Sequence, residues 1–183
     1  MTESIERTGS SKSNLWRIAR WTAALLLLLL PLVMMQFSDE WNWNIGGFLA
    51  AGIMIGGVGL LYELAERAST SRAYRAGVAI ALGASFLTIW TTIVRDDENG
   101  VGFLLLVMAA GASSFAAHFR AAGMARAMFG IAVMEMLLGM LIATAPSTAT
   151  LPFGPTQYLV YCGFFAFLWL SSAGLFRAAA RNG

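Results

Sequence analysis

Residues 45–75 read IGGFLAAGIMIGGVGLLYELAERASTSRAYR. The first eighteen of these residues carry no charge, and a helix needs about 20 mostly apolar residues to cross a bilayer core roughly 30 Å thick. The uncharged run leads into a segment that holds Arg67, Arg72 and Arg75. Because cytoplasmic loops of membrane proteins are enriched in Lys and Arg, this stretch predicts a transmembrane helix whose C-terminal end faces the cytoplasm.

The same kind of apolar run recurs along the chain. Six runs are long enough to cross a bilayer as helices: residues 21–37, 45–64, 76–94, 101–117, 127–145 and 158–176. None of them alternates apolar and polar residues with a period of two, as a transmembrane β-barrel would require. We therefore expect an all-α, polytopic membrane protein with six transmembrane helices.

Composition agrees with this class. Of the 183 residues, 58% are apolar and 12% are charged, whereas an average soluble domain has about 25% charged residues. Six spans of about 20 residues leave some sixty residues for loops and tails, which is too few for a soluble domain of ordinary size. Any function therefore resides in the bilayer or at its two surfaces.

The distribution of charge predicts the side that each loop faces. Eleven of the twelve basic residues lie in the first, third, fifth and seventh polar segments. The exception, Arg95, sits beside three acidic residues, and the loop of residues 38–44 is also acidic (Asp96, Asp97, Glu98; Asp39, Glu40). By the positive-inside rule, both termini are expected in the cytoplasm. Five tryptophans fall near predicted helix ends, as interfacial belts do (Trp16, Trp21, Trp41, Trp43, Trp90). Trp169 lies inside the last run, where we expect it to pack against a neighbouring helix.

The predicted organisation is simple. Residues 1–14 are polar and rich in Ser and Thr, which indicates a short disordered cytoplasmic tail. Residues 15–183 are expected to form one six-helix transmembrane domain. No small-residue cleavage site follows the first apolar run, so we interpret it as an uncleaved signal anchor. The expected location is the inner, or plasma, membrane of a bacterium.

Small residues indicate where helices can approach closely. Gly52 and Gly56 form a small-xxx-small element in the second run, and residues 109–114 of the fourth run are all small. Such residues let the backbones of two membrane helices come together. They predict packing within the bundle or contact with a second copy or another membrane protein.

Part of the chain resembles a known group of proteins. The pattern is Tyr62-Glu63-Leu64-x-x-Arg67, then Tyr74-Arg75-Ala76-Gly77, then Phe86-Leu87 and Trp90. It resembles a family of small polytopic bacterial inner-membrane proteins of unassigned function, over about residues 45–130. The loop that follows departs from the family's Glu-Asn-Pro-Ala-Asn pattern, since residues 97–100 read Asp-Glu-Asn-Gly. The resemblance implies a membrane protein and implies no chemistry.

Glu135 is the main candidate for a functional residue. It lies in the middle of the run 127–145, where a charge costs about 2.5–3.5 kcal/mol on insertion scales. Ser85 is the midpoint of the run 76–94, which crosses in the same direction, and Thr88 is one turn further out. Glu135, Ser85 and Thr88 are therefore a candidate intramembrane polar site. Two interpretations remain open: a proton or cation relay, and an interhelical hydrogen bond that fixes packing.

A second candidate site lies at the cytoplasmic end of the second run. Glu63 and Arg67 are four residues apart, the spacing that lets a Glu–Arg pair form on one helix face. The pair is either a solvated helix end or a gate or docking edge for a partner.

Other chemistries lack the residues they need. Cys162 and His118 are the only cysteine and the only histidine, whereas a zinc site needs three or four ligands. We predict no catalytic residue, no cofactor and no metal site, and we interpret Cys162 as a small filler of the last run. The excess of basic residues marks helix ends near lipid headgroups and does not indicate a nucleic-acid-binding face.

The functional expectation is a structural or accessory membrane protein without catalysis of its own. Its expected partners are membrane lipid and either further copies of itself or a larger membrane complex. The alternative is a small transporter or proton-linked channel that uses Glu135. A membrane enzyme is the least favoured reading.

Overall fold

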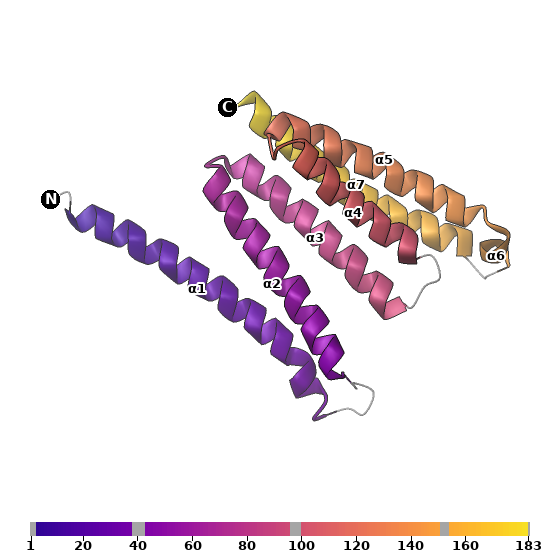
Figure 1. The fold of residues 1–183 in the computed structure, drawn as a ribbon, viewed down its shortest axis with the longest axis horizontal. Helices are drawn as coiled ribbons and strands as arrows, with labels where there is room; N and C mark the ends of the chain where they lie inside the picture. Colours follow the sequence, from indigo (N-terminus) through magenta and orange to yellow (C-terminus); the bar gives the residue numbers. More distant parts are fainter. Residues whose placement is uncertain (1–2, 38–42, 96–99, 151–153, 183) are drawn as a thin grey trace. The chain divides into compact units, whose positions relative to one another are not determined.

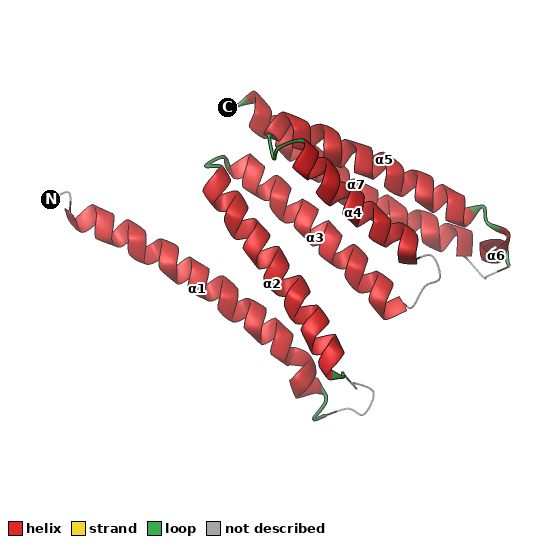
Figure 2. Cartoon of the chain, in the orientation of Figure 1, coloured by secondary structure: helices red, strands yellow, loops and turns green. Residues whose placement is uncertain are grey.

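The computed structural model describes residues 3–37, 43–95, 100–150 and 154–182. Throughout these ranges every regular element is a helix, as Figure 2 shows. The helices are α1 (Glu3–Met34), α2 (Ile45–Ala68), α3 (Arg72–Arg95), α4 (Gly100–Ala116), α5 (Ala121–Ala143), α6 (Pro146–Ala149) and α7 (Gly154–Arg181). The acidic segments predicted to face outward, and Trp41, lie outside the described residues.

Each predicted apolar run corresponds to one helix. The helices α1, α2, α3, α5 and α7 are long and apolar enough to cross a membrane. The remaining apolar helix, α4, has 17 residues and is shorter. The chain is therefore a helical membrane protein of several spans. The short α6 begins with Pro146 in its first turn, where the missing N–H of proline costs no hydrogen bond.

The N-terminal segment differs from the expectation. Helix α1 begins at Glu3, so it includes most of the segment that was predicted to be a disordered tail. That segment contains no proline and a single glycine. Once the apolar part of α1 has formed, extending a helix by one residue is far easier than starting a new one.

Contacts group the chain into two compact units, residues 1–61 and 62–183. Within the first unit, small residues of α2 meet large side chains of α1. A Cβ atom placed on Gly59 would lie 3.2 Å from the Trp21 ring, and one placed on Gly52 would lie 3.8 Å from Leu28. The predicted small face of α2 therefore packs in part against α1.

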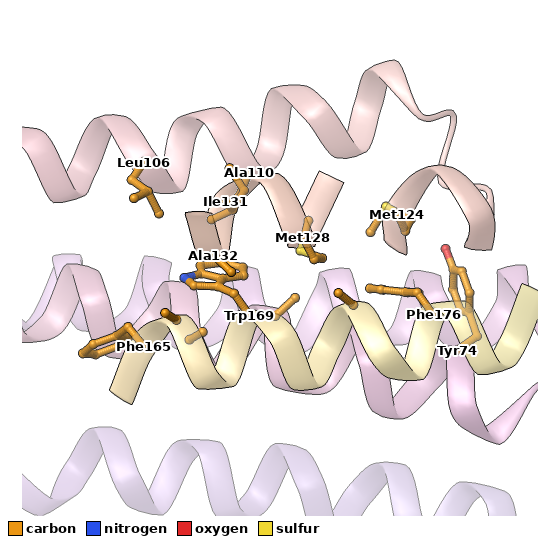
Figure 3. Packing of buried hydrophobic residues seen from close by; sticks show 14 of the residues in the cluster. Tyr74, Leu106, Ala110, Met124, Met128, Ile131, Ala132, Phe165, Trp169 and Phe176 are labelled. Atoms are coloured by element: carbon orange, nitrogen blue, oxygen red, sulfur yellow. The ribbon is translucent and has the colours of Figure 1, made fainter. Parts of the chain in front are cut away.

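The second unit is a four-helix bundle of α3, α4, α5 and α7, which Figure 1 shows side by side. Each of these helices packs on two others in the cyclic order α3, α4, α5, α7, and α5–α7 is the most extensive pair. Figure 3 shows the shared core, which is built largely from alanine, methionine and aromatic residues. Its best buried members are Ala84, Met128, Ile131, Ala132, Trp169 and Phe176.

The contact between α3 and α7 depends on one glycine. A Cβ atom on Gly77 would lie 3.3 Å from the ring of Phe176. One turn away on α7, the Ser172 hydroxyl donates a buried hydrogen bond of 2.8 Å to the Gly77 carbonyl oxygen. The absent side chain thus exposes a backbone acceptor, and Ser172 uses it. Such close backbone approach is what small residues permit in membrane bundles.

The turn between α4 and α5 is strained and held in place. His118 and Phe119 have φ values of 50° and 55°, a left-handed conformation that costs a non-glycine residue roughly 1–2 kcal/mol. The Tyr74 hydroxyl donates a hydrogen bond of 2.8 Å to the Phe119 carbonyl oxygen. Because Tyr74 lies in the first turn of α3, this bond fastens the turn to the start of another helix.

The same tyrosine shows which helix ends lie together. The Tyr74 ring also packs edge-on against Phe176 near the end of α7, with ring centroids 5.2 Å apart. The α2–α3 loop, the α4–α5 turn and the C-terminal part of α7 therefore meet at one end of the bundle. That end carries four arginines next to these contacts: Arg72, Arg75, Arg120 and Arg177.

Candidate functional site

Glu135 lies on the buried face of α5. Its side chain is 0% exposed, and Ile131, Ala132 and Gly139 are buried on the same helix. The opposite face of α5 is exposed and apolar, with side chains suited to lipid (Phe129, Val133, Met134, Leu137, Leu141). The polar residue of this helix thus points into protein, the usual arrangement for ionisable residues within membrane spans.

The neighbours of Glu135 come from α7. The Cys162 thiol and the Trp169 indole lie close enough to interact with its carboxyl group, and both residues are 0% exposed. Within the part of the chain that the structure describes, however, both carboxyl oxygens of Glu135 and Nε1 of Trp169 lack a hydrogen-bond partner. An unpaired buried polar group costs about 1–3 kcal/mol, so this is an unusual group of atoms.

A glycine brings α5 close enough to α7 for these contacts. A Cβ atom on Gly139 would lie 2.6 Å from Cβ and 2.7 Å from Sγ of Cys162, which no side chain can occupy without movement of a helix. Gly139 is one turn beyond Glu135 on α5. The role predicted for Cys162, a small filler, fits this contact, because the thiol packs directly against the glycine backbone.

The structure does not pair Glu135 with the hydroxyls predicted from sequence. Ser85 donates 2.9 Å to the carbonyl oxygen of Ala81 on its own helix. Thr88 is 0% exposed, and its hydroxyl has no hydrogen-bond partner among the described residues. The expected bond from either residue to Glu135 is therefore absent. The physical reason is the order of the bundle: α3 and α5 lie across it from one another and are not adjacent.

Trp169 and Cys162 were not predicted as neighbours of Glu135. Ser85 and Thr88 belong to a run that crosses in the same direction as the Glu135 run. The oppositely directed run 158–176 has its midpoint at Phe167, two residues from Trp169, so the indole is also expected near the depth of Glu135. Trp169 was also the one tryptophan far from both predicted membrane surfaces.

The second candidate site has the predicted pair. Nη2 of Arg67 lies 3.1 Å from Oε1 of Glu63, and the Arg67 side chain is 70% exposed while Glu63 is 13% exposed. Next to it, the Arg75 guanidinium donates to the carbonyl oxygens of Ser69 (2.7 Å) and Glu66 (3.0 Å) at the end of α2. A cation that binds the last carbonyls of a helix stabilises its C-terminus. The geometry fits a stabilised helix end.

No metal centre is apparent within the described ranges, where no three His, Cys, Asp or Glu side chains come together. Comparison of the chain with protein-family models, with curated proteins and with solved structures found no match. The resemblance of residues 45–130 to a family of small membrane proteins therefore stays a prediction.

Proposed function

We propose that this protein is a multi-pass protein of the bacterial inner membrane, with six spans and both termini in the cytoplasm. The observation that carries this topology is the meeting of the α2–α3 loop, the α4–α5 turn and the end of α7 at one end of the bundle. All three segments are basic. Clustering of Lys and Arg on one side is the expected signature of the cytoplasmic surface.

The proposed sixth span is α4. Its 17 residues correspond to about 26 Å at a rise of 1.5 Å per residue, close to the bilayer core of roughly 30 Å. It packs between α3 and α5, and both of those helices are long enough to cross. A hydrophobic helix slightly shorter than the core is tolerated by local thinning of the bilayer.

We propose that the protein acts as a structural or accessory subunit without catalysis of its own. Glu135 supports this because its side chain is fully enclosed by protein. A transported ion would have to reach it along a polar path. Two surface cavities of about 560 and 550 Å³ are lined by other residues, one by the outer parts of α4 and α5 with Pro146, and one by residues 17–25 of α1.

The proposed partner surfaces are two: one at the remaining small residues of α2 and one at those of α4. No atom of the described part of its own unit lies within 4 Å of a Cβ placed on Gly56, and the same holds for Gly111 of α4. Bulky residues at such positions should block close helix contact with a second copy or another membrane protein.

Native mass spectrometry from mild detergent tests this role. We expect the purified protein to appear as an oligomer or with a stoichiometric partner, and Gly56→Leu or Gly111→Leu to reduce that species. Gly130→Leu is the matched control, because Gly130 also has open space around it but lies on α5. A protein that is only monomeric, with no bound partner, would contradict the proposal.

The alternative function, a small transporter or proton-linked channel, draws support from the unpaired polar atoms of Glu135, Trp169 and Thr88. Reconstitution into liposomes with a pH-sensitive dye separates the two functions. The structural role predicts the same proton leak for the wild type and for Glu135→Gln. A flux that Glu135→Gln abolishes would replace the structural role with the alternative.

A further inference from the structure

Three unpaired atoms of the bundle core belong to two side chains that lie near each other. They are Oε1 and Oε2 of Glu135 and Nε1 of Trp169, and among the described residues none of them has a hydrogen-bond partner. Both side chains are 0% exposed. Buried polar atoms are almost always paired with protein or with ordered water, so these three unpaired atoms indicate that a further group binds to them.

The orientation of Trp169 fits a group placed between the two side chains. Figure 3 shows the indole nitrogen at the end of the Trp169 ring that is directed toward Phe165. Glu135 follows Ala132 by three residues on α5, in that same direction along the bundle. The Trp169 indole is one of the two side chains that interact with the Glu135 carboxyl group.

The chemistry of the two side chains restricts what can bind. The indole N–H can only donate a hydrogen bond, whereas a carboxyl group offers acceptor oxygens. A cation would satisfy the carboxyl group and be repelled by the indole N–H, and an anion would do the opposite. A water molecule accepts from one and donates to the other, and buried waters commonly make about three such bonds.

The surrounding residues also favour a small guest. Ala132 lies three residues from Glu135 on α5 and Ala166 three residues from Trp169 on α7, and both of these small side chains are buried. The Cys162 thiol is a further neighbour of the carboxyl group.

We propose that one structural water molecule binds between Glu135 and Trp169, accepting from the indole N–H and donating to a carboxyl oxygen. It joins α5 to α7 at the centre of the bundle. The inference rests on the proposed structural role of Glu135, because a water held by two enclosed side chains strengthens helix contact and does not form a path across the membrane.

Nuclear magnetic resonance of the full-length protein, with ¹⁵N-labelled tryptophan in detergent micelles, tests the water directly. The chain has six tryptophans, and the indole signal that disappears in Trp169→Phe identifies Trp169. We expect a cross-relaxation peak between that indole proton and water whose sign in the rotating frame excludes chemical exchange. The peak should be lost in Glu135→Met, which keeps side-chain length, and retained in Glu135→Gln, which keeps an acceptor.

Ser172→Ala is the control, because it removes another buried polar group of α7 that already has a partner. The water peak should persist in it. The proposal is overturned if wild-type Trp169 shows no water contact, or if the contact survives Glu135→Met. A shift of the Trp169 signal in Glu135→Gln without any water peak would show a direct bond between the two side chains instead. Since proton flux and oligomeric state are measured separately, failure of the water site is distinguishable from failure of the proposed function.

Discussion

Helices α1 and α7 are similarly apolar, yet they are used in different ways. Only 6% of the membrane-spanning window of α1 is buried inside the protein, against 39% of that of α7. α1 presents a leucine run, Leu25–Leu30, in which four of the six side chains are 49–63% exposed (Leu25, Leu26, Leu27, Leu30). α7 instead presents Cys162, Ala166, Ser172 and Ala173 to its neighbours. The comparison teaches that apolarity decides whether a helix enters a membrane, while small and polar residues decide what it packs against.

The largest expected difference between the two regions is the cost of truncating a leucine. Leu106 of α4 is 3% exposed and Leu27 of α1 is 55% exposed. Leu106→Ala should leave a cavity in the bundle and lower the free energy of unfolding by about 2–5 kcal/mol. Leu27→Ala should change it by less than about 1 kcal/mol, because lipid or detergent chains fill the space. Denaturant titration in micelles measures both, and equal losses would refute the contrast.

Overpacking the α5–α7 contact should have the next largest effect. Gly139→Ala places a methyl group 2.6 Å from Cβ of Cys162, which should cost about 1–3 kcal/mol through helix displacement. Gly130→Ala on the same helix meets no atom within 4 Å and should be neutral or slightly stabilising. If both variants unfold at the same denaturant concentration, α5 and α7 are not in the close contact described.

Two adjacent serines of α7 allow the contribution of an interhelical hydrogen bond to be compared with that of a bond within one helix. Ser172 bonds across to Gly77 of α3, whereas Ser171 is half-buried and bonds to Phe167 of its own helix. Ser172→Ala should lower the free energy of unfolding by about 1 kcal/mol, and Ser171→Ala should leave it nearly unchanged. The reverse order of effects in thermal unfolding would mean that another face of α7 meets α3.

The smallest expected effect is at the end of α2. The Glu63–Arg67 pair has an exposed guanidinium, and such pairs on helices contribute about 0.3–0.5 kcal/mol. Arg67→Ala should therefore barely change stability, and the small difference should vanish in high salt. A loss above about 1 kcal/mol would indicate that Arg67 holds a partner or another segment.

The sequence was sufficient for the elements of the fold but not for their arrangement. Each apolar run became a helix because the bilayer core requires internally paired backbone groups, and Glu135 proved to be buried, as its cost in lipid demands. The order of helices was not predictable, since a run of apolar residues packs equally well in many orders. That order placed Trp169 and Cys162 beside Glu135, and it put α3, the helix of Thr88, across the bundle from α5.

Two local features, the left-handed turn and the close contact at Gly139, also depend on residues far apart in sequence. His118 and Phe119 adopt a strained, left-handed conformation that these residue types normally avoid, so the sequence does not predict it. The hydrogen bond that compensates for the strain comes from Tyr74, which is far away in sequence. The stripe of glycines in α2 was visible in the sequence, but Gly139, where an added Cβ atom would lie 2.6 Å from Cβ of Cys162, is in α5, outside that stripe. Close approach required one glycine opposite one small residue, and a repeated motif was not needed.

The topology is tested most directly by fusing alkaline phosphatase, which is active only outside the cytoplasm, after single residues of the full chain. Fusions after Arg72 and Arg120 should both be inactive, and a fusion after Glu98 should be active. That result places the basic end of the bundle in the cytoplasm, as proposed. Activity after only one of the two arginines would put them on opposite sides of the membrane and would contradict the account.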